Sequence, residues 1–247
     1  MSSSNETTPC NQINTIWSSW IVPPVAAGAA IVPTYYGFAV KTAQQLQKPI
    51  PTISALEALM GGLRLAPTVA GLVGTQMVLQ NASERKIKQL FGNPEDKAAT
   101  LVETAASSLL VGAMSAPGIA IFNGQAAKQS PRNSLRNLTV KQAGAISAQE
   151  TAFVMGMSAG GHVYAFAKEH FGDNEAMKYG SSFITGALGS LCGHPANTAL
   201  TLWQNGLKVE NIFQLARGGP VKAIATGVFS MGFQLAKEHL NNLGQKH

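Results

Sequence analysis

The chain has 247 residues, of which 12% are charged and 7% aromatic, with a formal net charge of +6 and a mean hydropathy of +0.08. The charged share is about half that of an ordinary soluble domain, which favours a helical membrane protein and leaves a soluble, Ala-rich helical protein as the alternative. Two cysteines, five scattered histidines and the lack of a Gly-rich phosphate loop or a Ser/His/Asp order argue against a metal site, a cofactor and an enzyme.

Residues 1–18 are expected to form a polar N-terminal tail. The first basic residue is Lys41, so this tail lacks the basic start of a secretory signal and the arginines of a mitochondrial presequence. If the protein reaches a membrane, we expect its targeting information to lie further along the chain.

Six weakly charged stretches follow, each about as long as a helix that crosses a bilayer. Gly, Ser, Thr and Gln interrupt them, which predicts helices with one face on protein and not on lipid all round. The odd-numbered stretches contain Pro33, Pro117 and Pro195, 84 and 78 residues apart, and a proline inside a helix kinks it. The stretches cover residues 22–44, 57–82, 101–127, 140–166, 178–204 and 214–236.

This threefold recurrence predicts one all-α transmembrane domain over residues 1–247, with six transmembrane helices in three repeats of two. Each of the three prolines is followed by a glutamine near the end of its stretch, namely Gln44, Gln125 and Gln204. The repeats cover about residues 20–92, 99–172 and 177–246.

Charges alternate between the connections of these stretches. Counted together with the adjoining parts of the stretches, the connections inside the three pairs hold nine basic residues, Lys41 among them, against two acidic ones, whereas the connections between the pairs and the C-terminal end hold eight of each. In a six-span protein this is the positive-inside asymmetry, with both termini on the neutral side. Chance, or a basic patch for an acidic partner, is the alternative explanation.

The odd stretches resemble the odd helices of the mitochondrial carrier family, in which a run of small residues precedes a proline and a bracing glutamine. In the best copy His194 precedes Pro195, and Gln204 stands nine residues after the proline, where the family has its glutamine. In the second copy Gln125 comes one position early. The copies cover residues 186–205, 106–125 and, most loosely, 26–44.

The even stretches are also similar to this family, whose even helices end in an aromatic, an acidic and a basic residue. Here the corresponding segments are Tyr164–Lys168 and Phe233–Lys237. The acidic position of the pattern is occupied by Ala165 and Gln234, so the ion pairs at this end are at most partial.

The ring of inter-repeat ion pairs that the family has on its basic-loop side is absent. The acidic positions after the three prolines hold Tyr35, Ile119 and Asn197, and the basic positions hold Phe38, Phe122 and Leu200. We therefore expect this end to close by apolar contact and not by reversible ion pairs. The repeats are also shorter than those of the family, and the shortening falls in the basic loops, where the family has a short surface helix.

Two charges lie deep in a stretch, Glu150 in the fourth and Lys222 near the start of the sixth. Together with Gln149 they are candidates for a substrate cavity in which the two charges bind a zwitterion such as an amino acid. The alternative, which we favour, is that Lys222 extends to the membrane interface and Glu150 lies near a helix start, where the helix dipole stabilises it.

Basic residues of the loops are candidates for binding anionic lipid headgroups such as cardiolipin, which members of the family bind. The segment 128–141 lacks the aromatic side chains that stack on bases, which argues against nucleic acid. The candidate headgroup ligands are Arg132, Arg136, Lys141, Arg217 and Gly218.

The leading hypothesis is a divergent, carrier-like protein of the mitochondrial inner membrane, with both termini on the intermembrane-space side. The missing charges favour a structural or accessory subunit of a larger membrane complex, with protein partners. The retained prolines, Gln204 and Lys237 favour the alternative, a transporter of a small, weakly charged or zwitterionic solute. The heavy erosion of the motifs leaves the outer membrane open as a location.

Overall fold

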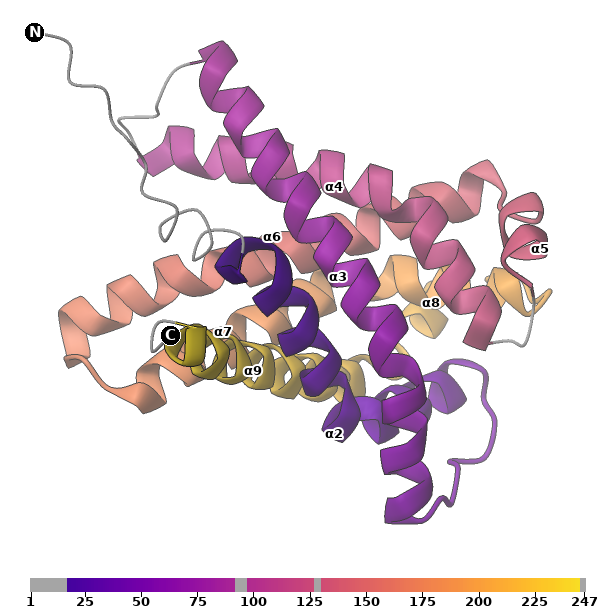
Figure 1. The fold of residues 1–247 in the computed structure, drawn as a ribbon. Helices are drawn as coiled ribbons and strands as arrows, with labels where there is room; N and C mark the ends of the chain where they lie inside the picture. The colour runs from indigo at the N-terminus through magenta and orange to yellow at the C-terminus, as the bar shows by residue number, and fades with distance from the viewer. Residues whose placement is uncertain (1–16, 92–96, 127–129, 245–247) are drawn as a thin grey trace, which may run out of the picture.

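The computed structural model describes residues 17–91, 97–126 and 130–244, and this part of the chain is all helical (Figure 1). It contains eight α-helices, a short π-helix and a 3-10 helix. In chain order the elements are η1 (Trp17–Ile21), α2 (Val22–Gln45), α3 (Ala55–Phe91), α4 (Lys97–Ala126), α5 (Pro131–Arg136), α6 (Val140–Phe171), α7 (Glu175–Cys192), α8 (His194–Gln204), η2 (Ile212–Ala216) and α9 (Gly219–Gly244).

Each of the six predicted stretches is helical, which confirms the all-α prediction. The fifth stretch is divided into α7 and α8, because the chain leaves the helix at Gly193 and Pro195 lies in the first turn of α8, where its missing N–H costs least. The helices α2 and α4 continue through Pro33 and Pro117. The break at the third proline is therefore observed, and the kinks at the first two stay predictions.

The long helices form a closed ring. Helix α2 packs against α3, α3 against α4, α4 against α6, α6 against α7, and α7 against α9, which packs against α2. The two ends of the described chain lie side by side, because Trp17 Nε1 donates a hydrogen bond of 3.2 Å to the Leu240 carbonyl oxygen. We call this the terminus end of the ring, and the end that carries the connections 46–54, 130–139 and 205–218 the basic-loop end.

Glycines allow the helices of the ring to cross at short distance. A Cβ atom added at Gly156 of α6 would lie 2.7 Å from the Thr185 carbonyl oxygen and 2.8 Å from Gly189 Cα, both in α7. A Cβ atom at Gly62 of α3 would lie 2.7 Å from Val32 Cα in α2. Small residues at crossings are typical of helices that pack in lipid.

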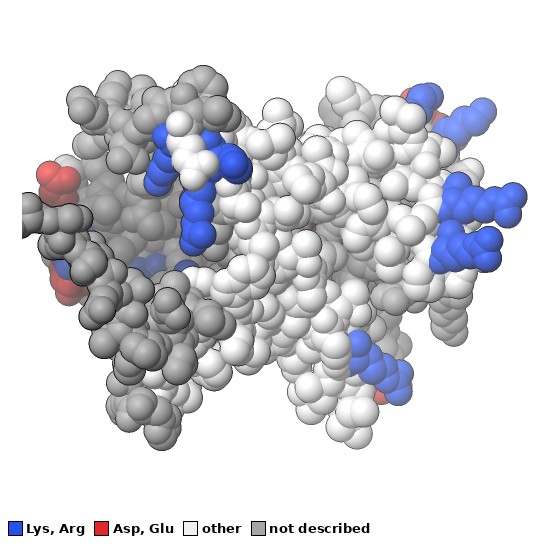
Figure 2. All heavy atoms as spheres, turned by 45° about the horizontal axis from the view of Figure 1, so that its top comes forward, with Lys and Arg blue, Asp and Glu red and all other residues white. Residues whose placement is uncertain are grey.

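Three helical segments are long and apolar enough to cross a membrane, namely Trp17–Gln45, Ala55–Gln89 and Val102–Ile121. The surface agrees with such a setting: Figure 2 shows a broad band without charged side chains between two ends at which Lys, Arg, Asp and Glu gather. Large apolar side chains, among them Leu109, Ile184 and Ile224, are exposed on the outside of the ring.

Candidate functional site: a buried polar cluster and an adjoining cavity

Charged and amide side chains gather inside the ring toward its basic-loop end. Glu150 and Lys222 are only 5% and 6% exposed, and Lys41 and His194 are buried with them. Because these four side chains are buried, each charge among them must be stabilised by protein groups. The polar cluster consists of Lys41, Gln45, Gln76, Gln149, Glu150, His194, Asn197, Thr198 and Lys222.

Asn197 of α8 is the centre of this cluster. Its Oδ1 accepts hydrogen bonds from Lys41 Nζ at 2.9 Å and from Gln45 Nε2 at 3.1 Å, both in α2. Its Nδ2 donates to Gln149 Oε1 of α6 at 2.5 Å. One side chain thus connects three helices that are far apart in the sequence.

Glu150 continues the chain of contacts toward the middle of the ring. Its Oε1 accepts a hydrogen bond of 2.9 Å from Gln149 Nε2, and its Oε2 accepts one of 2.7 Å from Gln76 Nε2 of α3. Lys222 of α9 is close enough to interact electrostatically with this carboxylate, although the two groups form no direct ion pair among the described residues.

These positions correct the interpretation that we favoured from the sequence. Lys222 does not extend to the surface, and Glu150 lies about three turns inside α6, which begins at Val140. The structure therefore brings Glu150, Gln149 and Lys222 together in the interior. Lys41, counted as a loop charge from the sequence, belongs to the last part of α2 and is buried.

The connection that precedes α9 packs against the polar cluster through its backbone. His194 Nε2 lies 2.8 Å from the Arg217 carbonyl oxygen, and since a carbonyl only accepts, Nε2 carries the proton and donates. Gly218 has a φ of +76°, and a Cβ atom there would lie 3.0 Å from the Lys41 carbonyl oxygen. Arg217 and Gly218, predicted as headgroup ligands, thus hold the start of α9 against α2 and α8 through their backbone.

Three of the six positions at which the expected ion-pair charges are missing, Ile119, Leu200 and Asn197, show what takes their place. Ile119 and Leu200 lie in an apolar cluster with Ala116, Ala120 and Ile146, so the predicted apolar contact is confirmed there. Asn197 contradicts that prediction, because its amide forms the hydrogen bonds of the polar cluster. An amide can replace a carboxylate at this place because it both donates and accepts.

A cavity of about 400 Å³ adjoins the polar cluster and is partly open to the outside. The helices α3, α6, α7 and α9 enclose it, and Gln76, the partner of Glu150, belongs to its lining. The lining consists of Val73, Gln76, Met77, Gln80, Phe153, Val154, Met157, Ser158, Gly161, Ser182, Thr185, Phe229, Ser230, Phe233, Gln234 and Lys237.

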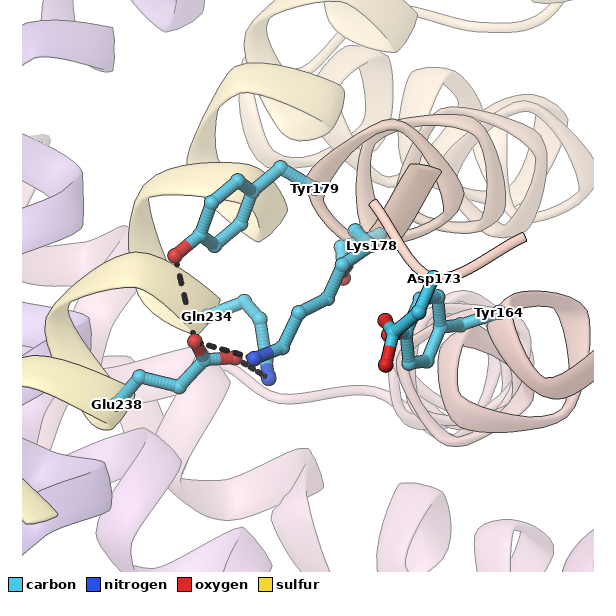
Figure 3. Close-up of polar contacts among 7 residues, drawn as sticks. Tyr164, Asp173, Lys178, Tyr179, Gln234 and Glu238 are labelled. Carbon is cyan, nitrogen blue, oxygen red and sulfur yellow. Dashed lines mark hydrogen bonds and ion pairs between the residues drawn. The ribbon is translucent and has the colours of Figure 1, made fainter. Parts of the chain in front are cut away.

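Toward the terminus end, charged side chains of α7 and α9 meet next to this cavity. Figure 3 shows Lys178, Tyr179 and Gln234 converging on Glu238, with Lys178 Nζ at 2.5 Å and Gln234 Nε2 at 2.6 Å from its carboxylate oxygens. Gln234 also lines the cavity. This group of side chains, which we call the rim, connects α7 with α9.

A second ion pair lies in the connection between α6 and α7. Lys168 Nζ is 2.5 Å from Asp173 Oδ2, and the Tyr164 hydroxyl donates to the other carboxylate oxygen. The hydrogen bond from Lys168, followed by that from Tyr164, holds the pKa of Asp173 below its usual value. Both partners of this pair are more than half exposed, so it is a surface feature.

The candidate headgroup ligands of the second basic loop lie on the surface. Arg132 and Arg136 belong to α5, which begins with an N-cap at Ser130, whose side chain accepts from the Asn133 backbone N–H. Both arginines and Lys141 are exposed at the basic-loop end. Two of the three basic loops thus contain a short helix, α5 or η2, despite the shortened repeats.

The bracing glutamines differ from their expected places. Gln204 is exposed at the end of α8, and the side chain of Gln125 lies outside the described part of the chain. Gln45, one residue after the predicted Gln44, is instead buried and donates to Thr198 Oγ1 at 2.8 Å. The sequence does contain an indication of this placement, because Lys41 and Gln45 are four residues apart and therefore share a helix face.

Gln76 and Gln80 of α3 were also not recognised as interior residues from the sequence. Both are buried, and their spacing of four residues places them on one face of an otherwise apolar segment.

A comparison of the chain with known protein-family models and with curated proteins finds no match. The argument for function therefore depends on the cluster and the cavity themselves.

Proposed function

We propose that this chain is an integral membrane protein with six spanning helical units that binds a small solute inside its ring of helices and carries it across the membrane. The observation that carries the proposal is the cavity of about 400 Å³, which adjoins the polar cluster at the basic-loop end of the ring. A binding site that is accessible from one side and closed on the other is what a carrier requires in one of its two states.

The arrangement of charges supports the membrane setting. Three segments are apolar enough to span a bilayer, and a band without charged side chains crosses the face of the molecule that Figure 2 shows. The remaining long helices are proposed to span with them because they belong to the same ring. The sequence resemblance favours the mitochondrial inner membrane, with the basic loops in the matrix and both termini in the intermembrane space.

Uptake into proteoliposomes tests the proposal, with a panel of labelled amines, amino acids, carboxylates and nucleotides. Gly161 lines the cavity and Gly144 lies outside it on the same helix; a Cβ atom at either would meet no other heavy atom within 4 Å. We expect Gly161→Phe to block uptake and Gly144→Phe to leave it unchanged. A folded protein that transports no solute of the panel, or an unchanged Gly161→Phe variant, contradicts transport.

A second candidate function is a structural subunit of a larger membrane complex. It is favoured by the closed end, which hydrogen bonds of Asn197 hold together in place of ion pairs that break and reform. Native electrophoresis of gently solubilised membranes distinguishes the two candidates. Migration with a large assembly in stoichiometric amount supports the subunit, and migration as a small protein–detergent particle supports the independent carrier.

A further inference from the structure

Lys237 is the one charged residue in the described lining of the cavity. Its ammonium group forms no hydrogen bond and no ion pair within the described part of the chain. The carboxylate of Glu238, the next residue of α9, is engaged elsewhere, because Lys178 and Gln234 bind it at the rim (Figure 3). An ammonium group without a partner on the wall of a cavity attracts an anion and forms charge-assisted hydrogen bonds with it.

The lining, as far as the chain is described, contains no carboxylate that would hold a cation. Two acidic residues adjoin it, and each already accepts a hydrogen bond from a lining amide. Glu150 accepts one of 2.7 Å from Gln76 Nε2. Glu84 accepts one of 2.6 Å from Gln80 Nε2. The lining therefore has one positive charge and no negative one, which favours an anion over a cation as the ligand.

Neutral groups of the lining add donors to this charge. An amide nitrogen carries two hydrogens, and Gln234 Nε2 uses one of them toward Glu238. The second remains for a ligand, and Gln234 lies three residues before Lys237, on the same face of α9. The Ser158 hydroxyl also lines the cavity and forms no hydrogen bond among the described residues. A carboxylate next to Lys237 can thus accept from a second group of the same helix.

The charged end of the cavity is also its accessible end. Lys237 is half-buried, and Gly161 of α6, which lines the cavity with it, is exposed. Both lie nearer the terminus end of the ring than Val154 and Phe229, which are buried. A ligand that enters from the terminus end therefore passes Lys237 before it reaches the inner wall.

This inner wall is apolar and aromatic. The rings of Phe229 and Phe233 have centroids 6.4 Å apart and are nearly parallel, and Phe153 lies 6.3 Å from Phe229. Val73 and Met77 of α3 complete the apolar part of the lining. Such a wall packs against an apolar, preferably flat, group. The volume of about 400 Å³ is in the range of small-molecule sites, roughly 300–1,000 Å³.

We propose that the cavity takes a monocarboxylate with a small apolar body. The carboxylate lies at the accessible end, where it accepts from Lys237 and from the second N–H of Gln234, and the body packs against Phe153, Phe229 and Phe233. One ammonium group compensates one negative charge, so a dicarboxylate or a phosphate would leave a charge unpaired. The proposal names the substrate class of the proposed transporter and therefore rests on that function.

Three probes with the same phenylethyl body test the assignment: 3-phenylpropionate, 3-phenylpropanamide and 2-phenylethylammonium. Calorimetry of the full-length protein in phosphatidylcholine nanodiscs, with empty nanodiscs subtracted, measures their binding. We expect the carboxylate to bind at least tenfold more tightly than the neutral amide, and the ammonium probe to bind most weakly. Equal or tighter binding of the amide or of the ammonium probe, or no binding of the carboxylate, overturns the assignment.

Variants of Lys237 test whether this side chain provides the preference. Lys237→Met should weaken binding of the carboxylate about tenfold and leave binding of the amide unchanged, whereas Lys237→Arg keeps the charge and should keep the preference. Lys168→Met removes the same charge from an exposed site outside the lining and should change carboxylate binding by less than twofold. Equal losses for Lys237→Met and Lys168→Met, or no loss for Lys237→Met, contradict the proposal.

Proteoliposome uptake separates this assignment from transport itself. Uptake of ammonium solutes in preference to monocarboxylates overturns the assignment and leaves the transporter intact. Binding of 3-phenylpropionate without uptake of any solute supports the assignment and contradicts transport.

Discussion

The two ends of the ring hold their polar groups in different ways. At the basic-loop end, Asn197 satisfies Lys41, Gln45 and Gln149 at once, and these partners come from α2 and α6. At the terminus end, Glu238 is satisfied by Lys178, Tyr179 and Gln234, which come from α7 and from α9 itself.

The difference concerns which helices the contacts connect. The polar cluster joins helices of all three predicted repeats, so the basic-loop end cannot separate without exposing or leaving unpaired several buried groups. Among the described residues the rim joins α7 and α9, which both belong to the third predicted repeat. We therefore expect the polar cluster to dominate stability and the rim to contribute little, which variants on each side can test.

The largest effect is expected for Asn197→Leu. This change removes the acceptor of the buried Lys41 ammonium and the donor of Gln149 together, and leaving such groups unpaired costs about 3 kcal/mol. The free energy of unfolding in detergent micelles should fall by that amount. The same substitution at the exposed Asn205, at the end of α8, is the control and should change it by less than about 0.5 kcal/mol. Similar losses for both variants would contradict the role of Asn197.

A smaller effect is expected for Gly156→Ala in the crossing of α6 and α7. The new methyl group would lie within 2.8 Å of two α7 backbone atoms, and forcing apart a packed crossing costs about 1–3 kcal/mol. Gly144→Ala in the same helix meets no atom within 4 Å, so it should be neutral or stabilise the protein by up to about 1 kcal/mol through helix propensity. Thermal unfolding of the two variants measures the difference, and a stable Gly156→Ala variant would show that the crossing is looser than described.

Coupling between Glu150 and Lys222 should be weaker still. Each single change, Glu150→Gln or Lys222→Met, leaves one buried charge without compensation, whereas the double change removes both. We expect the double variant to lose about 1–2 kcal/mol less free energy of unfolding than the two single variants lose together, and a double-mutant cycle measures this difference. Additivity within about 0.5 kcal/mol would mean that the two groups do not compensate each other.

The helices of this fold were predictable from local features of the sequence. Segment length, the positions of Pro33, Pro117 and Pro195, and the charges of the connections are properties of short windows, and every predicted stretch is helical. The exact ends were less predictable, because α3 and α6 continue past residues 82 and 166, where the predicted stretches end, into segments that contain charged residues.

The site was much less predictable, because it depends on which faces meet when the ring closes. Lys41 lies next to a loop in the sequence but is turned inward by the packing of α2 against α9, and its spacing of four residues from Gln45 is its one local indication of an inward face. Glu150 and Lys222 were recognised as deep charges, but their environment came from Gln76 and Asn197 on other helices. The spacing of Gln76 and Gln80 was a second local signal of this kind, an inward polar face on an apolar helix.

The smallest effect is expected at the rim, from Lys178→Met. Lys178 and Glu238 are 32% and 24% exposed at the side chain, and partly exposed ion pairs contribute less than about 1 kcal/mol. Lys208→Met makes the same change of charge in an exposed loop and serves as the control. Because salt screens accessible charges, the difference between the two variants should shrink as NaCl is raised from low concentration toward 1 M. A loss as large as that of Asn197→Leu, unaffected by salt, would mean that the rim stabilises the ring as much as the polar cluster does.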